Sequence, residues 1–202
     1  STALKKEDTH SDYRPDEFNY STANSSAKFL FSQSKQKFVT FPLNMDKIEV
    51  DYQVDKINNF KITDDNGVKY FYGIDSNSKE RINPLTHRFY NSWSISKIEN
   101  VKNQTITFLY ELYNLHIYEK LVLFMNDLTV TATNDNLISL ESSYVSEIKY
   151  PEGKVEFIAE TAREYLKQFP KLKSIIFKDK SNQIIKTISF NYSYFIKNSG
   201  SI

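Results

Sequence analysis

The feature that most constrains this chain is a recurring unit of two alternating apolar strands separated by a turn of Asp, Asn, Lys or Gly. Side chains of a strand alternate between two faces, so apolar residues at every second position bury one face of a sheet. Asp, Asn and Gly reverse the chain because they tolerate positive φ or hydrogen-bond to their own backbone. The unit occurs in residues 60–72 (FKITDDNGVKYFY), 95–108, 145–157 and 175–188.

This pattern predicts a mainly β protein, an antiparallel array of hairpins with about ten to fourteen strands. The hairpins follow one another without the long returns of a Greek key, so we expect an open curved sheet or half-barrel rather than a compact sandwich. One segment differs. Residues 162–168 contain good helix formers before Pro170, and they predict one short helix.

The remaining stretches fix the expected organisation. We expect a hairpin from residues 28–31 and 37–41, a strand at 47–52, a surface loop at 73–90, and two strands in 117–133 that reverse near Asn126 and Asp127. The polar residues 1–13 predict a flexible N-terminal segment, followed by a single β-rich domain at 14–197 and a tail at 198–202.

Composition excludes several classes of protein. With 40% hydrophobic residues, the chain has the apolar surface that a folded core needs. Its 26 basic and 25 acidic residues are interspersed, which argues against nucleic acid as a partner. It has no cysteine, and no apolar run is long enough for a membrane-spanning segment. Because the chain does not open with Met, we expect that an N-terminal signal segment has been removed.

Residues that could carry chemistry are scattered. His10, His87 and His116 lie far apart and form none of the spacings that a zinc site uses. The acidic run at 64–67 superficially suggests a calcium loop, but a hairpin turn explains it and no closing Glu follows. There is no nucleophile-elbow motif and no identifiable carboxylate pair. We therefore expect no catalytic, cofactor-binding or metal-binding residues, and no enzyme.

Aromatic residues near the 73–90 loop are the best candidates for a ligand or partner face: Tyr70, Tyr72, Phe89 and Trp93. Exposed rings could stack on sugars or peptides, whereas alternate-face core residues would be buried. Because Phe71 lies between Tyr70 and Tyr72, both faces of the strand carry a ring there. Two-sided burial or an interface is the favoured interpretation.

The turn of the 60–72 hairpin gives the sharpest local prediction. An Asn-Gly pair between alternating strands favours a turn with φ above zero at both central residues, so we expect positive φ at Gly67. We expect Asp64 to keep ordinary strand geometry and to tolerate replacement by Ser.

Several segments, in shared order, resemble the N-terminal part of very large surface proteins of the Bacteroidetes that belong to the RHS/YD-repeat-like group and are related to toxin-complex shell proteins. The similarity covers roughly residues 12–195. It is carried by DYRPDEFNY (12–20) with AKF (27–29), FKITDDNGVKYFYG (60–73), NSWSISKI (91–98), TITFLY (105–110), IKYPEGKVEF (148–157), segment 163–175 and IKTISFNYSYF (185–195). The glycine that the family has near residues 25–27 is absent here.

The resemblance implies a non-catalytic structural or interaction module of a secreted or cell-surface protein. Family members are much longer, so we expect either an excised piece or a short relative. The implied partners are neighbouring β units of the same or another surface protein, with weak self-association through unpaired sheet edges. The alternative is a carbohydrate- or lipid-binding β module that uses a concave, aromatic-lined sheet face.

Overall fold

The protein is an open assembly of antiparallel strands, as the alternation predicts. The computed structural model describes residues 17–32, 34–35, 37–53, 56–82, 90–121, 134–160 and 169–193. Within these ranges it contains fourteen strands and one short 3-10 helix, η1 (Ser76–Ser78). The strands are β1 (Glu17–Ser21), β2 (Ser26–Ser32), β3 (Lys37–Phe41), β4 (Lys47–Gln53), β5 (Lys56–Thr63), β6 (Lys69–Tyr72), β7 (Lys79–Ile82), β8 (Ser92–Trp93), β9 (Ile95–Glu99), β10 (Thr105–Leu121), β11 (Asn134–Tyr150), β12 (Gly153–Glu160), β13 (Lys171–Asp179) and β14 (Ile184–Ser189).

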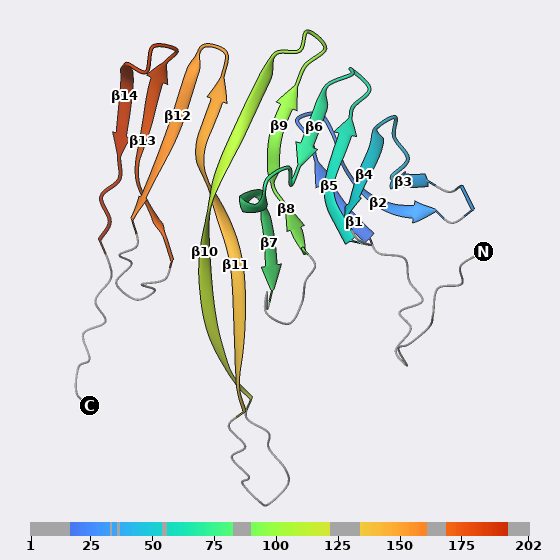
Figure 1. The fold of residues 1–202 in the computed structure, drawn as a ribbon, viewed down its shortest axis with the longest axis horizontal. Helices are drawn as coiled ribbons and strands as arrows, with labels where there is room; N and C mark the ends of the chain where they lie inside the picture. The colour runs from blue at the N-terminus through green and yellow to red at the C-terminus, as the bar shows by residue number, and fades with distance from the viewer. Residues whose placement is uncertain are drawn as a thin grey trace, which may run out of the picture.

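The strands form two sheets. The small sheet has the order β1-β2-β3, and the eleven-stranded large sheet has the main path β14-β13-β12-β11-β10-β9-β6-β5-β4. Off this path, β7 pairs with β11, and β8 pairs with β7. The large sheet is not closed into a barrel, and Figure 1 shows it fanning from β14 to β4. The turns β5–β6, β9–β10, β11–β12 and β13–β14 all lie along its upper rim (Figure 1).

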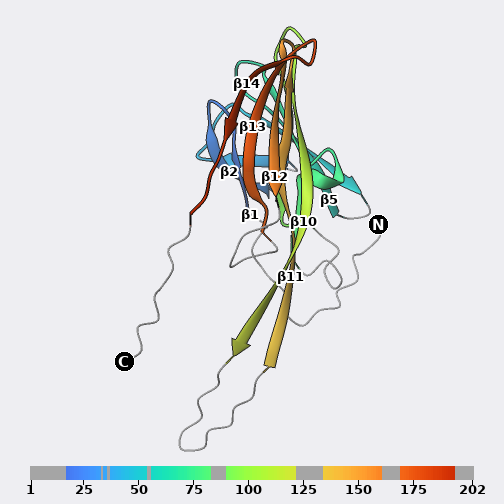
Figure 2. The ribbon, with the colours of Figure 1, turned by 90° about the vertical axis from the view of Figure 1, so that its left-hand side faces the viewer.

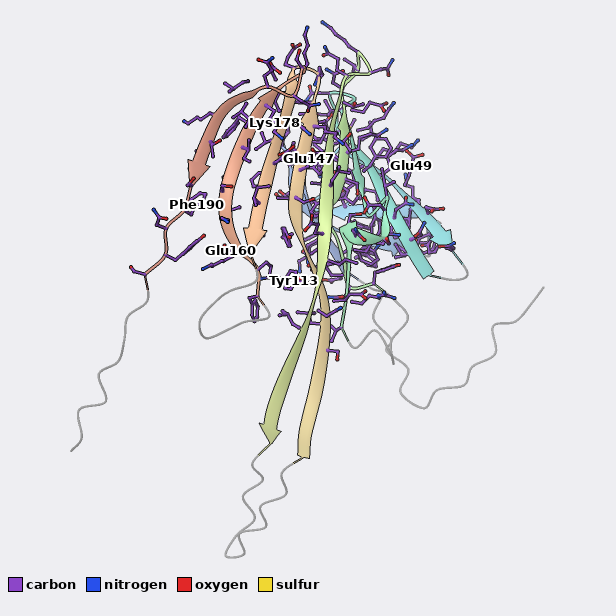
Figure 3. All side chains as sticks on the ribbon, turned by 60° about the vertical axis from the view of Figure 1, so that its left-hand side comes forward. Glu49, Tyr113, Glu147, Glu160, Lys178 and Phe190 are labelled. Carbon is purple, nitrogen blue, oxygen red and sulfur yellow. The ribbon has the colours of Figure 1, made fainter. Side chains whose placement is uncertain are left out.

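One face of the large sheet is charged. A single line of paired positions runs from β4 to β13 and contains Glu49, Lys61, Phe71, Lys97, Thr107, Lys149, Lys154 and Lys178. Neighbouring carboxylates join these lysines in ion pairs, among them Lys61–Glu49 at 2.8 Å and Lys178–Glu156 at 2.7 Å. The hydrogen bond from Lys61 lowers the pKa of the Glu49 carboxyl. Figure 3 shows Glu49, Glu147 and Lys178 spread across this sheet.

The opposite face is apolar, and over its β4–β9 half it is covered by the small sheet. Phe29 of β2 packs on Phe60 of β5 with ring centroids 5.3 Å apart, and Ile62 beneath them is 1% exposed. Tyr20 and Tyr70 complete this buried cluster. Burial of these rings and aliphatic chains supplies the main hydrophobic stabilisation of the described fold.

The β12–β14 half has no second layer among the described residues. Its apolar side chains form two cross-strand rows, one through Phe108, Ile148, Val155 and Phe177, the other through Phe157, Ile175 and Ile188. No residue of β12, β13 or β14 is fully buried. Among the described residues, this half of the sheet therefore forms a single layer.

Three hairpin turns share one geometry. Asp64, Asn100 and Asp179 each accept two backbone N–H groups on a side-chain oxygen, from the second and fourth residues that follow. The third residue that follows has positive φ: 79° at Gly67, 59° at Asn103 and 62° at Asn182. The side chain thus fixes the turn, and Gly or Asn occupies the left-handed position.

The prediction for Gly67 is confirmed, but its turn differs from the one expected. Gly67 N–H donates to Asp64 O at 3.0 Å, so the central residues are Asp65 and Asn66, and Asn66 does not have positive φ. This is a turn followed by a glycine bulge. The small cost expected for Asp64→Ser stays a prediction, and the structure argues against it, because the buried Asp64 carboxylate also accepts from Asn24 Nδ2 at 3.0 Å.

The 73–90 segment is not simply a loop. Its first half contains η1 and β7, and β7 pairs with β11 far along the chain. Arg81 and Glu141 form an ion pair of 2.5 Å across this contact. The periodicity missed β7 because its four residues, KERI, carry little apolar alternation.

Several expectations fall outside the described residues. These are the helix at 162–168, the reversal near Asn126 and Asp127, and the domain boundaries at residues 13 and 197. The strands leading to that reversal are described: β10 and β11 pair from Thr107 with Lys149 to Leu121 with Asn134, and their ribbon projects well beyond the sheet (Figure 2).

Replacing Gly67 by Val should lower the free energy of unfolding by on the order of 1–2 kcal/mol, because a β-branched residue is strained at positive φ. Its Cβ would also lie 3.0 Å from Val101 Cγ1. Asp64→Ala should cost about 2 kcal/mol through lost hydrogen bonds to a buried carboxylate. Asp65→Ser, at an exposed turn position, is the control and should be nearly neutral. Urea unfolding midpoints measure all three; equal stability of Asp64→Ala and Asp65→Ser would contradict this account.

Candidate functional site

A cavity lies beside two of the predicted aromatic residues, between the small sheet and the strands β5, β6 and β8. Its volume is about 460 Å³, within the range of small-ligand sites. It is lined by Glu17, Phe18, Asn19, Tyr20, Ser21, Phe29, Phe60, Ile62, Tyr72, Asn91, Ser92 and Trp93.

The structure separates the four residues predicted from the sequence. Tyr72 and Trp93 line the cavity. Tyr70 is 2% exposed and belongs to the buried cluster, so its ring is not available for stacking on a ligand. Phe89 lies outside the described residues. The alternation in β6 turns Tyr70 and Tyr72 inward, while Phe71 lies on the charged face under Lys97 Nζ, 4.1 Å from its ring centroid.

Trp93 is held firmly at the cavity wall. Its Nε1–H donates to Asn58 O at 3.0 Å, and its ring meets Phe60 edge-on with centroids 4.9 Å apart. Gly73, with φ 72°, lets the indole approach the backbone, since a Cβ there would lie 2.3 Å from Trp93 Cδ1. A packed ring with its N–H satisfied is a pre-formed apolar surface.

Tyr72 closes one end of the cavity. Its hydroxyl donates to the backbone oxygen of Ser21 at 2.6 Å, which ties β6 to β1. Burial raises the pKa of this hydroxyl above its ordinary value. The tyrosine therefore remains a neutral donor over the physiological range.

Sequence reasoning missed the β1 side of this site. Phe18 and Tyr20 stand in alternating positions of β1 and pack inward, Phe18 with its ring centroid 6.1 Å from that of Trp93. The sequence signal for this strand was weak, because β1 has only five residues (EFNYS) and just two of them are aromatic.

The acidic residues near the 64–67 turn form a polar cluster between the two sheets. Asp46 accepts from Tyr20 Oη at 2.5 Å, Ser25 Oγ at 2.7 Å and Asn44 Nδ2 at 3.2 Å. Its carboxylate thus joins the β1–β2 turn to the start of β4. Burial, followed by the bond to Asp46, raises the pKa of Tyr20 to about 12.

Within the described ranges, no three His, Cys, Asp or Glu residues are grouped to hold a metal ion. Of the histidines, His10 and His87 lie outside these ranges, and His116 lies in β10, opposite Ser139 of β11. No helix in the part of the chain that the structure describes has the length and apolar character to cross a membrane.

No protein-family model matches this chain, and neither does any curated protein or solved structure. The resemblance to RHS/YD-repeat-like surface proteins therefore stays a prediction.

The raised pKa of Tyr20 predicts a loss of stability in alkali. The pKa of Tyr20 is about 12 in the native state, whereas the ordinary pKa of a tyrosine hydroxyl is 10.0. The contribution of the Tyr20 hydroxyl is therefore fully present below pH 10 and is lost as the pH rises to about 12. The stability gap between wild type and Tyr20→Phe, measured by urea unfolding, should narrow over this interval. A gap that stays constant would contradict the role given to Tyr20.

Proposed function

We propose that this chain is a non-catalytic structural and interaction module of a secreted or cell-surface protein, in which the β14 side of the large sheet joins a neighbouring β unit. The observation that carries the proposal is the exposed state of β14. Five of its six residues are exposed, with Ile184 at 62% and Ile185 at 69%.

β14 has the properties of a joining edge. Within the described ranges it pairs with β13 alone, so its other side presents backbone groups that no described strand pairs with. A bulge at Ile185 lies close to the turn and leaves 186–189 as a regular edge. Lys186 is the one charged residue of the strand, so little charge opposes pairing with a second strand.

The opposite edge differs. β4 carries Lys47, Glu49 and Asp51 at alternate positions. Such charges are a common protection of sheet edges against association. This asymmetry supports addition of a strand at β14 rather than at β4.

The single-layered half supports the same proposal. Its half-buried rows, through Phe177 and Ile175, are the extension of the apolar face that the small sheet covers over β4–β9. A neighbouring β unit that pairs with β14 would bring a second layer within reach of these rows. Covering them would add hydrophobic stabilisation of roughly 25 cal/mol per Å² of apolar area.

The location and the class of partner rest on the sequence resemblance. It supports a place in a large surface protein whose hairpins continue the same sheet. The sequence on both sides of this segment in its gene tests that part directly: further YD-type hairpins would support it, and an unrelated flanking domain would count against it.

Self-association of the chain tests the edge itself. In sedimentation velocity over a wide concentration range, the wild type should form concentration-dependent oligomers through β14. Ile185→Lys places a charge on the edge and should weaken association at least about tenfold. Gln183→Lys, which adds the same charge in the neighbouring turn, is the matched control and should behave as wild type. A strictly monomeric wild type at the highest concentration would contradict the proposal.

A further inference from the structure

A second free edge lies beside the cavity. Among the strands that the structure describes, β1 pairs with β2 alone, and the Thr22 N–H donates to Ser25 O in the turn between them. In an antiparallel pair, hydrogen-bonded positions alternate, so Phe18 and Tyr20 bond to β2. The N–H and C=O groups of Glu17 and Asn19 therefore point away from β2. Ser21 is the next residue of β1 whose backbone points away from β2. Its oxygen accepts a hydrogen bond from Tyr72 Oη, which confirms this direction.

This edge borders an aromatic wall. Phe18, Phe60 and Trp93 contact one another, with centroid separations of 5.5 Å for Phe18–Phe60 and 4.9 Å for Phe60–Trp93. The Tyr72–Ser21 hydrogen bond closes the cavity at one end. At the other end the Glu17 side chain is exposed and forms an ion pair with Lys28. The cavity of about 460 Å³ thus has the outward backbone groups of β1 along one side and rings on the other, and Asn91 and Ser92 complete its lining.

The kind of polar group decides the ligand class. Because Phe18 and Tyr20 face the core, the side chains of Glu17 and Asn19 lie on the opposite face of β1. What β1 offers the cavity is therefore backbone. A sugar is usually oriented by polar side chains, and a lipid would leave the backbone groups unpaired. An extended peptide satisfies both sides, with main-chain hydrogen bonds to the edge and an apolar side chain against the rings.

We propose that β1 and this cavity bind an extended peptide segment of a partner protein, which adds a strand to β1 and inserts one aromatic or aliphatic side chain beside Trp93. The site is separate from the β14 edge, which lies at the other end of the large sheet (Figure 1). It goes beyond the proposed function, because β14 would join a folded unit whereas β1 would take a linear segment.

Selection from a display library of random linear peptides on the immobilised protein tests this inference. Enriched peptides should carry one apolar residue among β-forming residues and should shift the fluorescence of Trp93, which is the sole tryptophan of the chain. Asn19→Pro removes an outward N–H from the edge, a change that edge strands tolerate, and should weaken binding at least about tenfold.

Asn19→Ala is the matched control, because it changes the side chain and keeps the backbone N–H; it should bind as wild type. Melting curves establish that Asn19→Pro is folded, and Ile185→Lys should leave peptide binding unchanged. Three results would overturn the inference: no enriched peptide, peptides whose affinity is the same for Asn19→Pro and wild type, or glycan-array binding that depends on Trp93 in place of peptide binding.

Discussion

The packing of the small sheet on the apolar face of β4–β9 is the interaction on which the rest of the structure depends. An antiparallel sheet with one charged face and one apolar face has to bury the apolar one. Phe29, Phe60 and Ile62 do so at the centre of the contact. The Asp46 and Asp64 carboxylates then connect the two sheets through hydrogen bonds to Tyr20 and Asn24. The cavity beside Trp93 exists because this two-layered packing ends at β1.

The β10–β14 half depends on different forces. Backbone pairing and the cross-strand ion pairs hold it in register, and the Glu156 carboxylate there receives both Lys154 and Lys178. Ion pairs on the surface of a sheet contribute little each, although they disfavour alternative registers, which would place like charges opposite one another. The same charges keep that face soluble. Its apolar face has no second layer among the described residues, which is why we propose association on this side of the sheet.

The features that could be predicted from the sequence are those that depend on apolar alternation and on the residues of the turns. The paired strands of the 60–72 hairpin and the positive φ of Gly67 follow from local pattern, and the structure confirms both. The local pattern did not separate residues of one face: Tyr70 and Tyr72 share a face, yet Tyr70 is buried whereas Tyr72 lines the cavity and bonds to Ser21 of β1. Burial of Asp64 depends on Asn24, forty residues away. β7 is a strand because it meets β11, and its own residues carry little signal.

The order of the strands also has a consequence for which parts of the sheet open locally. Almost every neighbour in the large sheet is the next strand in sequence, so most pairing needs only short loops to close. The exceptions are β6 with β9 and the contact of β7 with β11. Cooperativity should therefore be graded: amides of β5 and β6, under the second layer, open only with global unfolding, while those of β13 and β14 exchange through local opening. The half in which we propose a partner to bind is thus the half whose backbone hydrogen bonds should open most easily.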